Sequence, residues 1–200
     1  MPEAQVVESR RIFAGKVLGV RIDSVRMSDG SVAEREVVDH PGSVVIVAVD
    51  EAQQVVLISQ YRHPVGSRLD ELPAGLLDVA GEVPLDAARR ELAEEAGLAA
   101  RDWQVLVDLH PSPGFCDEAV RVFLARGLSA DRPADFEPEH EELTLSVRRV
   151  PLGEGVRMAL AGELTNAAAV AGVLAAAHAA AAGWQGLRPA DAPWPSRPSR

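Results

Sequence analysis

Short apolar runs separated by turn sequences fill the first half of the chain, and this pattern predicts β-strands. Residues 11–27 and 32–38 are predicted strands, and the SDGS sequence between them favours a hairpin turn. Residues 43–50 are almost continuously β-branched, which indicates a central strand buried on both faces. After a polar turn, residues 55–59 are predicted to form the hairpin partner of that strand.

Helical signals appear later. Residues 84–97 have Pro84 in the first turn, Asp86 beside it and Gly97 at the end, which together predict one capped helix. The segment 60–82 before it is predicted to be mostly loop. Further strands are predicted at 103–109, 119–125 and 143–150, and further helices at 158–164 and 167–182. We therefore expect an α/β protein of the α+β type, in which helices cover the faces of a mixed sheet.

The charge, the lengths of the apolar runs and the cysteine content of the chain limit the classes of function that it can have. The 200 residues carry a net charge of −10, which argues against a nucleic-acid partner but not against a phosphate substrate held through a divalent cation. No run of about 20 apolar residues predicts a membrane span, and the polar N-terminus has no signal-peptide pattern. Cys116 is the only cysteine, so we expect a reducing, cytoplasmic location.

A cluster of carboxylates lies in the predicted helix, in the sequence RELAEEAGL. Glu91, Glu94 and Glu95 share one helix face with Arg90, although like charges at these spacings cost about 0.2–0.5 kcal/mol per pair. A divalent cation between them would remove this cost, and oxygen ligands select Mg²⁺, with Mn²⁺ as the alternative, over zinc. A solvated acidic helix face is the simpler explanation of these three residues taken alone.

The surrounding sequence favours the metal. The segment GLLDVAGEVPLDAARRELAEEAGL, residues 75–98, resembles the Nudix box GX5EX7REUXEEXGU and matches it at every fixed position from Glu82 onward. Gly75 stands one residue too early, so either the loop carries an extra residue or Gly81 supplies the flexible point. The resemblance implies a Nudix-like α/β/α sandwich with a mixed sheet, preceded by an N-terminal antiparallel hairpin or sheet.

Two further motifs resemble those of bacterial ADP-ribose pyrophosphatases. These are QYRH at 60–63 with ELPAG at 71–75, and Pro113 fifteen residues after Leu98. The resemblance implies Mg²⁺-dependent hydrolysis of ADP-ribose, a small nucleoside diphosphate, to AMP and ribose 5-phosphate. A nucleotide-sugar or other nucleoside-diphosphate pyrophosphatase is the alternative within this chemistry, and a non-catalytic Nudix-fold regulatory module is the alternative outside it.

The same resemblance implies roles for residues of the box. Arg90 pairs with Glu82 and holds the loop and helix in register. The metal ligands that it implies are Glu91, Glu94, Glu95 and the backbone carbonyl of Ala74.

Substrate contacts and the catalytic base lie outside the box. The resemblance places Arg62 near the substrate phosphates, and Pro113, Gly114 and Glu118 in a substrate loop, although an isolated Pro-Gly is more often an ordinary turn. Glu142 is the predicted general base, with Glu141 as the second candidate. A run of acids before a strand is otherwise only a solvated segment.

Three parts of the chain are expected. Residues 1–40 supply N-terminal strands that, by the resemblance, join two subunits into a homodimer; the alternative is packing on their own subunit. Residues 41–185 form the catalytic domain. Residues 186–200 are rich in proline and are predicted to be a flexible tail.

Overall fold

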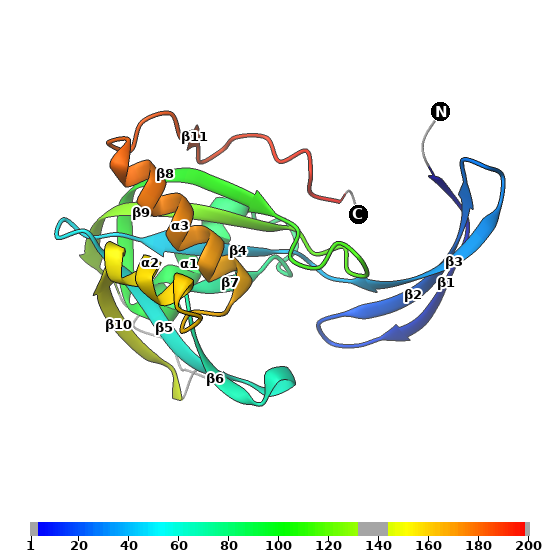
Figure 1. Ribbon diagram of the computed structural model, residues 1–200, viewed down its shortest axis with the longest axis horizontal. Helices are drawn as coiled ribbons and strands as arrows, with labels where there is room; N and C mark the ends of the chain where they lie inside the picture. The colour runs from blue at the N-terminus through cyan, green and yellow to red at the C-terminus, as the bar shows by residue number, and fades with distance from the viewer. Residues whose placement is uncertain (1–3, 132–143, 199–200) are drawn as a thin grey trace.

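A computed structural model of the chain describes residues 4–131 and 144–198. Its first sheet is antiparallel, consists of β1 (Ala4–Ala14), β2 (Gly19–Met27) and β3 (Val32–Asp39), and projects from one side of the molecule (Figure 1). The predicted strand 11–27 is therefore two strands, because the chain turns back at Gly15, whose N–H donates to the carbonyl of Leu18 at 2.8 Å. The N-terminal sheet has one strand more than the sequence indicates.

The central sheet has five strands in the order β11-β8-β9-β4-β7. Its strand β4 runs parallel to β9 and antiparallel to β7, so the sheet is mixed as expected. The whole of β4 is buried, which agrees with its continuous apolar sequence. The bounds of the strands are β4 (Ser43–Ala48), β7 (Ala74–Leu76), β8 (Leu98–Leu109), β9 (Val120–Ala130) and β11 (Arg188–Pro189).

A third sheet contains β5 (Gln54–Arg62), β6 (Ser67–Glu71) and β10 (Ser146–Pro151), in the order β10-β5-β6. The prediction that 55–59 pairs with 43–50 in a hairpin is wrong: β4 and β5 enter different sheets, and one isolated antiparallel bridge joins Val49 to Val55. Both edges of β4 are already hydrogen-bonded to β9 and β7, so β5 pairs elsewhere. The predicted loop 60–82 likewise contains β6, β7 and the short helix η1 (His63–Val65).

Helices cover both faces of the central sheet. One apolar core cluster joins the sheet to α1 (Pro84–Ala96), and another joins it to α2 (Leu152–Leu160) and α3 (Ala167–Ala181). The predicted helix end is confirmed, because Gly97 has a φ of 64° and its N–H donates to the carbonyls of Ala93 and Leu92. The α/β/α sandwich expected from the sequence is confirmed. None of the helices in the described part is long and apolar enough to cross a membrane.

The proline-rich segment after α3 lies against the central sheet, whereas the sequence predicts a flexible tail there (Figure 1). Arg121 explains the difference. Its side chain is 3% exposed, and besides its ion pair with Asp108 it donates to the carbonyls of Ala192 and Pro193 at 2.7 and 3.1 Å. The guanidinium also stacks on Trp194, 4.7 Å from the ring centroid. The buried guanidinium of Arg121 on β9 therefore holds the C-terminal segment against the sheet.

Candidate active site

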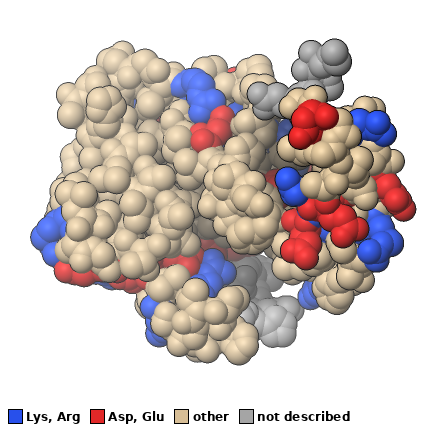
Figure 2. All heavy atoms as spheres, turned by 45° about the vertical axis from the view of Figure 1, so that its right-hand side comes forward, with Lys and Arg blue, Asp and Glu red and all other residues tan. Residues whose placement is uncertain are grey.

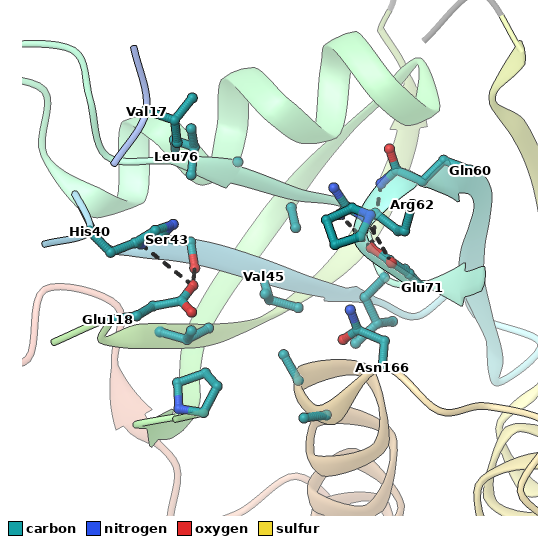
Figure 3. A pocket seen from close by; sticks show the side chains of 18 of the residues that line it. Val17, His40, Ser43, Val45, Gln60, Arg62, Glu71, Leu76, Glu118 and Asn166 are labelled. Carbon is teal, nitrogen blue, oxygen red and sulfur yellow. Dashed lines mark hydrogen bonds and ion pairs between the residues drawn. The ribbon is translucent and has the colours of Figure 1, made fainter. Parts of the chain in front are cut away.

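A cavity of about 850 Å³ opens between β4, β5, β7 and the start of α3 (Figure 3). Polar side chains lie at its two ends, and the apolar side chain of Val45 lies between them. This size and lining are typical of a site for a small molecule. The polar residues that line it are His40, Ser43, Gln60, Tyr61, Arg62, His63, Glu71, Glu95, Glu118 and Asn166.

At one end of the cavity, Glu71 is buried with only 2% of its surface exposed. Arg62 compensates this charge with a two-pronged contact, donating from Nε at 2.9 Å and from Nη2 at 2.6 Å, while Gln60 donates at 3.4 Å. The predicted phosphate-binding Arg62 thus lines the cavity with its fork held on Glu71. Glu71 belongs to the ELPAG motif, which was the only sequence signal for this buried carboxylate.

At the other end, Glu118 faces His40 and Ser43. The Ser43 hydroxyl donates to Glu118 Oε1 at 3.1 Å, and His40 Nδ1 lies 3.7 Å from the same oxygen. Glu118, a predicted substrate contact, therefore lines the cavity. Pro113 and Gly114 belong to the same loop but are not among the described residues that line the cavity.

Ser43 and His40 are functional candidates that the sequence did not reveal. Ser43 begins a strand whose apolar pattern indicates only burial, and His40 stands in a connection without any motif. Their approach to Glu118 joins residues more than seventy positions apart in the chain. A local sequence pattern cannot predict a contact between residues so far apart in the chain.

The carboxylates of α1 gather around Arg90. Its Nε and Nη2 donate to Glu82 at 3.0 and 3.1 Å, and Nη1 donates to Glu91 at 2.6 Å and to Glu94 at 3.1 Å. The hydrogen bond to Glu82, followed by the charge of Glu91, raises the pKa of the Arg90 guanidinium, despite the opposing effect of burial. Arg90 is thus a permanent cation within the cluster, and Glu82 ties it to the loop before the helix.

Two of the carboxylates reach strand β7. Glu95 Oε2 accepts a hydrogen bond from the Ala74 N–H at 2.9 Å, and a methyl group added to Gly75 would overlap the carboxylate of Glu91. Glu91 and Glu95 therefore lie against consecutive residues of one strand, and Ala74, Gly75 and Glu95 also line the cavity. Gly81, in the turn before Glu82, has a φ of 81°, so both glycines of this loop have a structural use.

The donor set suits a hard divalent cation, because carboxylate oxygens and a backbone carbonyl are the ligands that Mg²⁺ and Mn²⁺ accept. Within residues 4–131 and 144–198, however, no three His, Cys, Asp or Glu side chains already converge as a metal site. Arg90 holds the side chains of Glu91 and Glu94, which accounts for this spread. The residues fit a cation once Glu91 and Glu94 release Arg90, because Glu91 and Glu95 already lie beside β7.

The structure does not describe the residues predicted as the general base. Glu142 and Glu141 lie in the segment 132–143, outside the described residues. Strand β10 resumes at Ser146 beside Ser59 of β5.

Comparison with known proteins agrees with this architecture. Residues 39–166 match the model of the NUDIX domain. The chain is 48% identical to an ADP-ribose pyrophosphatase of Mycobacterium tuberculosis (strain ATCC 25618 / H37Rv) over 196 residues, 98% of this chain and 93% of the relative. It is 36% identical to a methanol dehydrogenase activator of Bacillus methanolicus, over 72% of this chain and 80% of the relative.

A solved structure supports the fold. The crystal structure of an ADP compounds hydrolase superposes with a TM-score of 0.77, covering 92% of this chain and 97% of its own, at 21% identity. At that identity, the likeness concerns the fold alone. The family model and the long alignments identify the family: this chain belongs to the Nudix family.

Proposed function

We propose that this protein hydrolyses the diphosphate of ADP-ribose to AMP and ribose 5-phosphate with Mg²⁺, or with Mn²⁺ in its place. The observation that carries the proposal is the position of Glu91 and Glu95 against β7, a strand that lines a cavity large enough for a nucleoside diphosphate. The two relatives named ADP-ribose pyrophosphatase, from M. tuberculosis and Bacillus subtilis (strain 168), support the choice of substrate. The B. subtilis protein is 39% identical over 64% of this chain and 68% of its own.

The residues divide the work as follows. Glu91, Glu94, Glu95 and the Ala74 carbonyl would hold the divalent cation, which supplies charge neutralisation for the diphosphate and acidifies a bound water. Arg90 keeps the unloaded carboxylates from repelling one another and stays anchored on Glu82 when Glu91 and Glu94 turn away. Glu142, or Glu141 in its place, accepts the proton of the attacking water.

Substrate binding uses both ends of the cavity. Arg62 can direct part of its guanidinium to a phosphate because its side chain is 44% exposed although it is held on Glu71. The Glu118 carboxylate, paired with the Ser43 hydroxyl, suits the hydroxyl groups of a sugar. Pro113 and Gly114 would shape the loop that carries Glu118. The cavity thus offers the Arg62 guanidinium for the phosphates and the Glu118 carboxylate as a hydrogen-bond acceptor for the sugar.

A substrate panel tests the proposed function. Release of AMP or GMP from ADP-ribose, ADP-glucose, NADH and GDP-mannose should be measured with Mg²⁺, with Mn²⁺ and with EDTA. We expect ADP-ribose to have the highest kcat/KM and EDTA to abolish turnover. Preference for ADP-glucose or GDP-mannose would assign a nucleotide-sugar pyrophosphatase instead, and no turnover of any compound would favour a regulatory module.

The N-terminal sheet is the proposed dimerisation unit. Every residue of β1 is exposed, including large apolar side chains at Val6, Val7, Ile12 and Phe13. A small sheet is stable only when its apolar face is covered, so these side chains call for a partner surface. Acidic and basic side chains lie side by side on this sheet (Figure 2), which suits a specific protein contact. Light scattering during gel filtration should give twice the chain mass; a monomer would mean that the sheet serves its own subunit.

The net charge of −10 disfavours a nucleic-acid partner, and the single cysteine favours the cytoplasm. We therefore propose a cytoplasmic protein that does not bind nucleic acid. A fractionation experiment on cells with native expression levels tests the location.

Gly75→Ala should lower kcat/KM about 10²-fold, the scale on which a displacement of about 1 Å affects a reacting geometry. The new methyl group overlaps the Glu91 side chain, which can move away, so the fold survives while the carboxylate is displaced. Gly153→Ala in α2 is the matched control, because a methyl group there meets nothing within 4 Å. A Gly75→Ala enzyme with unchanged kcat/KM would show that the position of Glu91 against β7 is irrelevant.

A further inference from the structure

A polar joint connects the N-terminal sheet to the loop that carries Glu118. The backbone part of this joint pairs the end of β3 with the loop: Val38 N–H donates to Phe115 at 2.7 Å, and Asp117 N–H donates to Val38 at 3.1 Å. A parallel bridge between Val38 and Cys116 describes the same contact. The loop is thus a short extension of the N-terminal sheet.

The charged part of the joint centres on Arg21 of β2. Its guanidinium makes ion pairs with Asp23 at 3.0 Å and with Asp39, and lies 3.6 Å from Asp117. Asp23 is only 6% exposed, and it also accepts the Ser9 hydroxyl of β1 at 2.6 Å. Three carboxylates, from β2, β3 and the loop, therefore share one cation, which offsets part of their mutual repulsion.

Asp117 passes this restraint on to the cavity. Its Oδ1 accepts the His40 N–H at 2.8 Å, and its neighbour in sequence, Glu118, accepts the Ser43 hydroxyl inside the cavity. The carbonyl of Glu118 also lies 3.1 Å from His110 Nδ1. The residues on both sides of the 117–118 peptide are therefore fixed, one by the N-terminal sheet and the other by the cavity wall.

We propose that Arg21 is a positioning residue for substrate binding: through Asp117 it holds Glu118 in the cavity. This proposal rests on the proposed function. Without Arg21, three carboxylates face one another without their shared cation, and like charges at this distance repel. Asp117 is the member on a loop, so it moves most easily and takes Glu118 with it.

The expected kinetic signature is a rise in KM. Glu118 lies at the end of the cavity away from the Arg62–Glu71 pair, so we expect its contact with the substrate to be equally strong in the ground state and the transition state. Arg21→Met should raise the KM for ADP-ribose about tenfold and change kcat less than about twofold, since a charge-assisted contact is worth about a factor of ten or more in binding. Arg21→Lys should restore part of the loss, because it keeps the charge without the fork.

A double-mutant cycle separates positioning from general destabilisation. If Arg21 acts through Glu118, Arg21→Met should raise KM in the wild-type background but have no further effect in Glu118→Gln. Arg26→Met is the matched control, because Arg26 is an exposed arginine on the same strand. Additive effects of the two substitutions on KM, or an equal effect of Arg26→Met, would overturn the proposal.

A measurement without substrate distinguishes this proposal from the proposed function. Hydrogen exchange at the amides of Val38, His40 and Asp117 should accelerate about tenfold in Arg21→Met while core amides of β4 stay protected. Unchanged exchange at these three amides would overturn the joint even in an active enzyme. Faster exchange in a protein that turns over no ADP-ribose would support the joint and refute only the proposed substrate.

Discussion

Glu95→Gln is expected to lower the kcat of ADP-ribose hydrolysis about 10³-fold, with the fold retained. The substitution keeps an oxygen that can accept the Ala74 N–H, now at 2.9 Å from the carboxylate, and so preserves the contact between α1 and β7. It removes one negative charge from the proposed metal ligands, and metal-ion catalysis supplies several kcal/mol, or about three factors of ten in rate. Initial rates of AMP release over a range of Mg²⁺ concentrations measure the loss.

Asp86→Asn is the matched control for that experiment. Asp86 lies on the same helix, but its carboxylate forms an exposed pair with Arg89 at 3.1 Å, away from β7. We expect its rate to stay within about twofold of the wild type, since such surface pairs contribute little. A Glu95→Gln enzyme that is as active as Asp86→Asn would exclude a metal site on this face of α1.

Glu142→Gln is the second substitution with a large expected effect. A glutamine cannot accept the proton of the attacking water, so kcat should fall about 10²–10⁴-fold, the usual loss for a general base. The affinity for Mg²⁺ should not change, because the proposed ligands lie on α1 and β7. Single-turnover rates and Mg²⁺ titrations on the same preparation separate the two effects.

Glu141→Gln provides the comparison, since it removes a neighbouring acid of the same segment. If Glu142 is the base, Glu141→Gln should lower the rate less than about tenfold, which is a smaller loss than the one expected on removal of a general base. The reverse result assigns the base to Glu141. Near-normal rates in both variants would move the proton acceptor into the helix α1 cluster, and circular dichroism confirms that each variant is folded.

The part of the site formed by α1 could be predicted because its signals are local. Pro84 in the first turn and Gly97 with its positive φ bound the helix, and their effects act within a few residues. Arg90 and Glu94 lie one helical turn apart, whereas the pairing of Arg90 with Glu82 was implied by the family resemblance; the structure shows both ion pairs.

Strand partners could not be predicted in the same way. A continuous apolar run such as 43–50 indicates burial but does not say which strands lie beside it, and its neighbours are β9 and β7 rather than the next strand in sequence. The tail from 188 onward has the composition of a linker, yet the buried Arg121 donates hydrogen bonds to two of its carbonyls and holds it in place. Both outcomes depend on residues far away in the chain.

The sequence by itself determined the carboxylate-bearing helix, the mixed sheet sandwich and, through the spacing of its motif, membership of the Nudix family. Only the tertiary structure decided that Glu118 meets Ser43 and His40, and that Arg21 of the N-terminal sheet reaches the same loop. The physical reason is the distance along the chain over which each interaction acts. Capping and helix spacing act between near neighbours, whereas a cavity is assembled by sheet register and by charges that find partners only after the chain has folded.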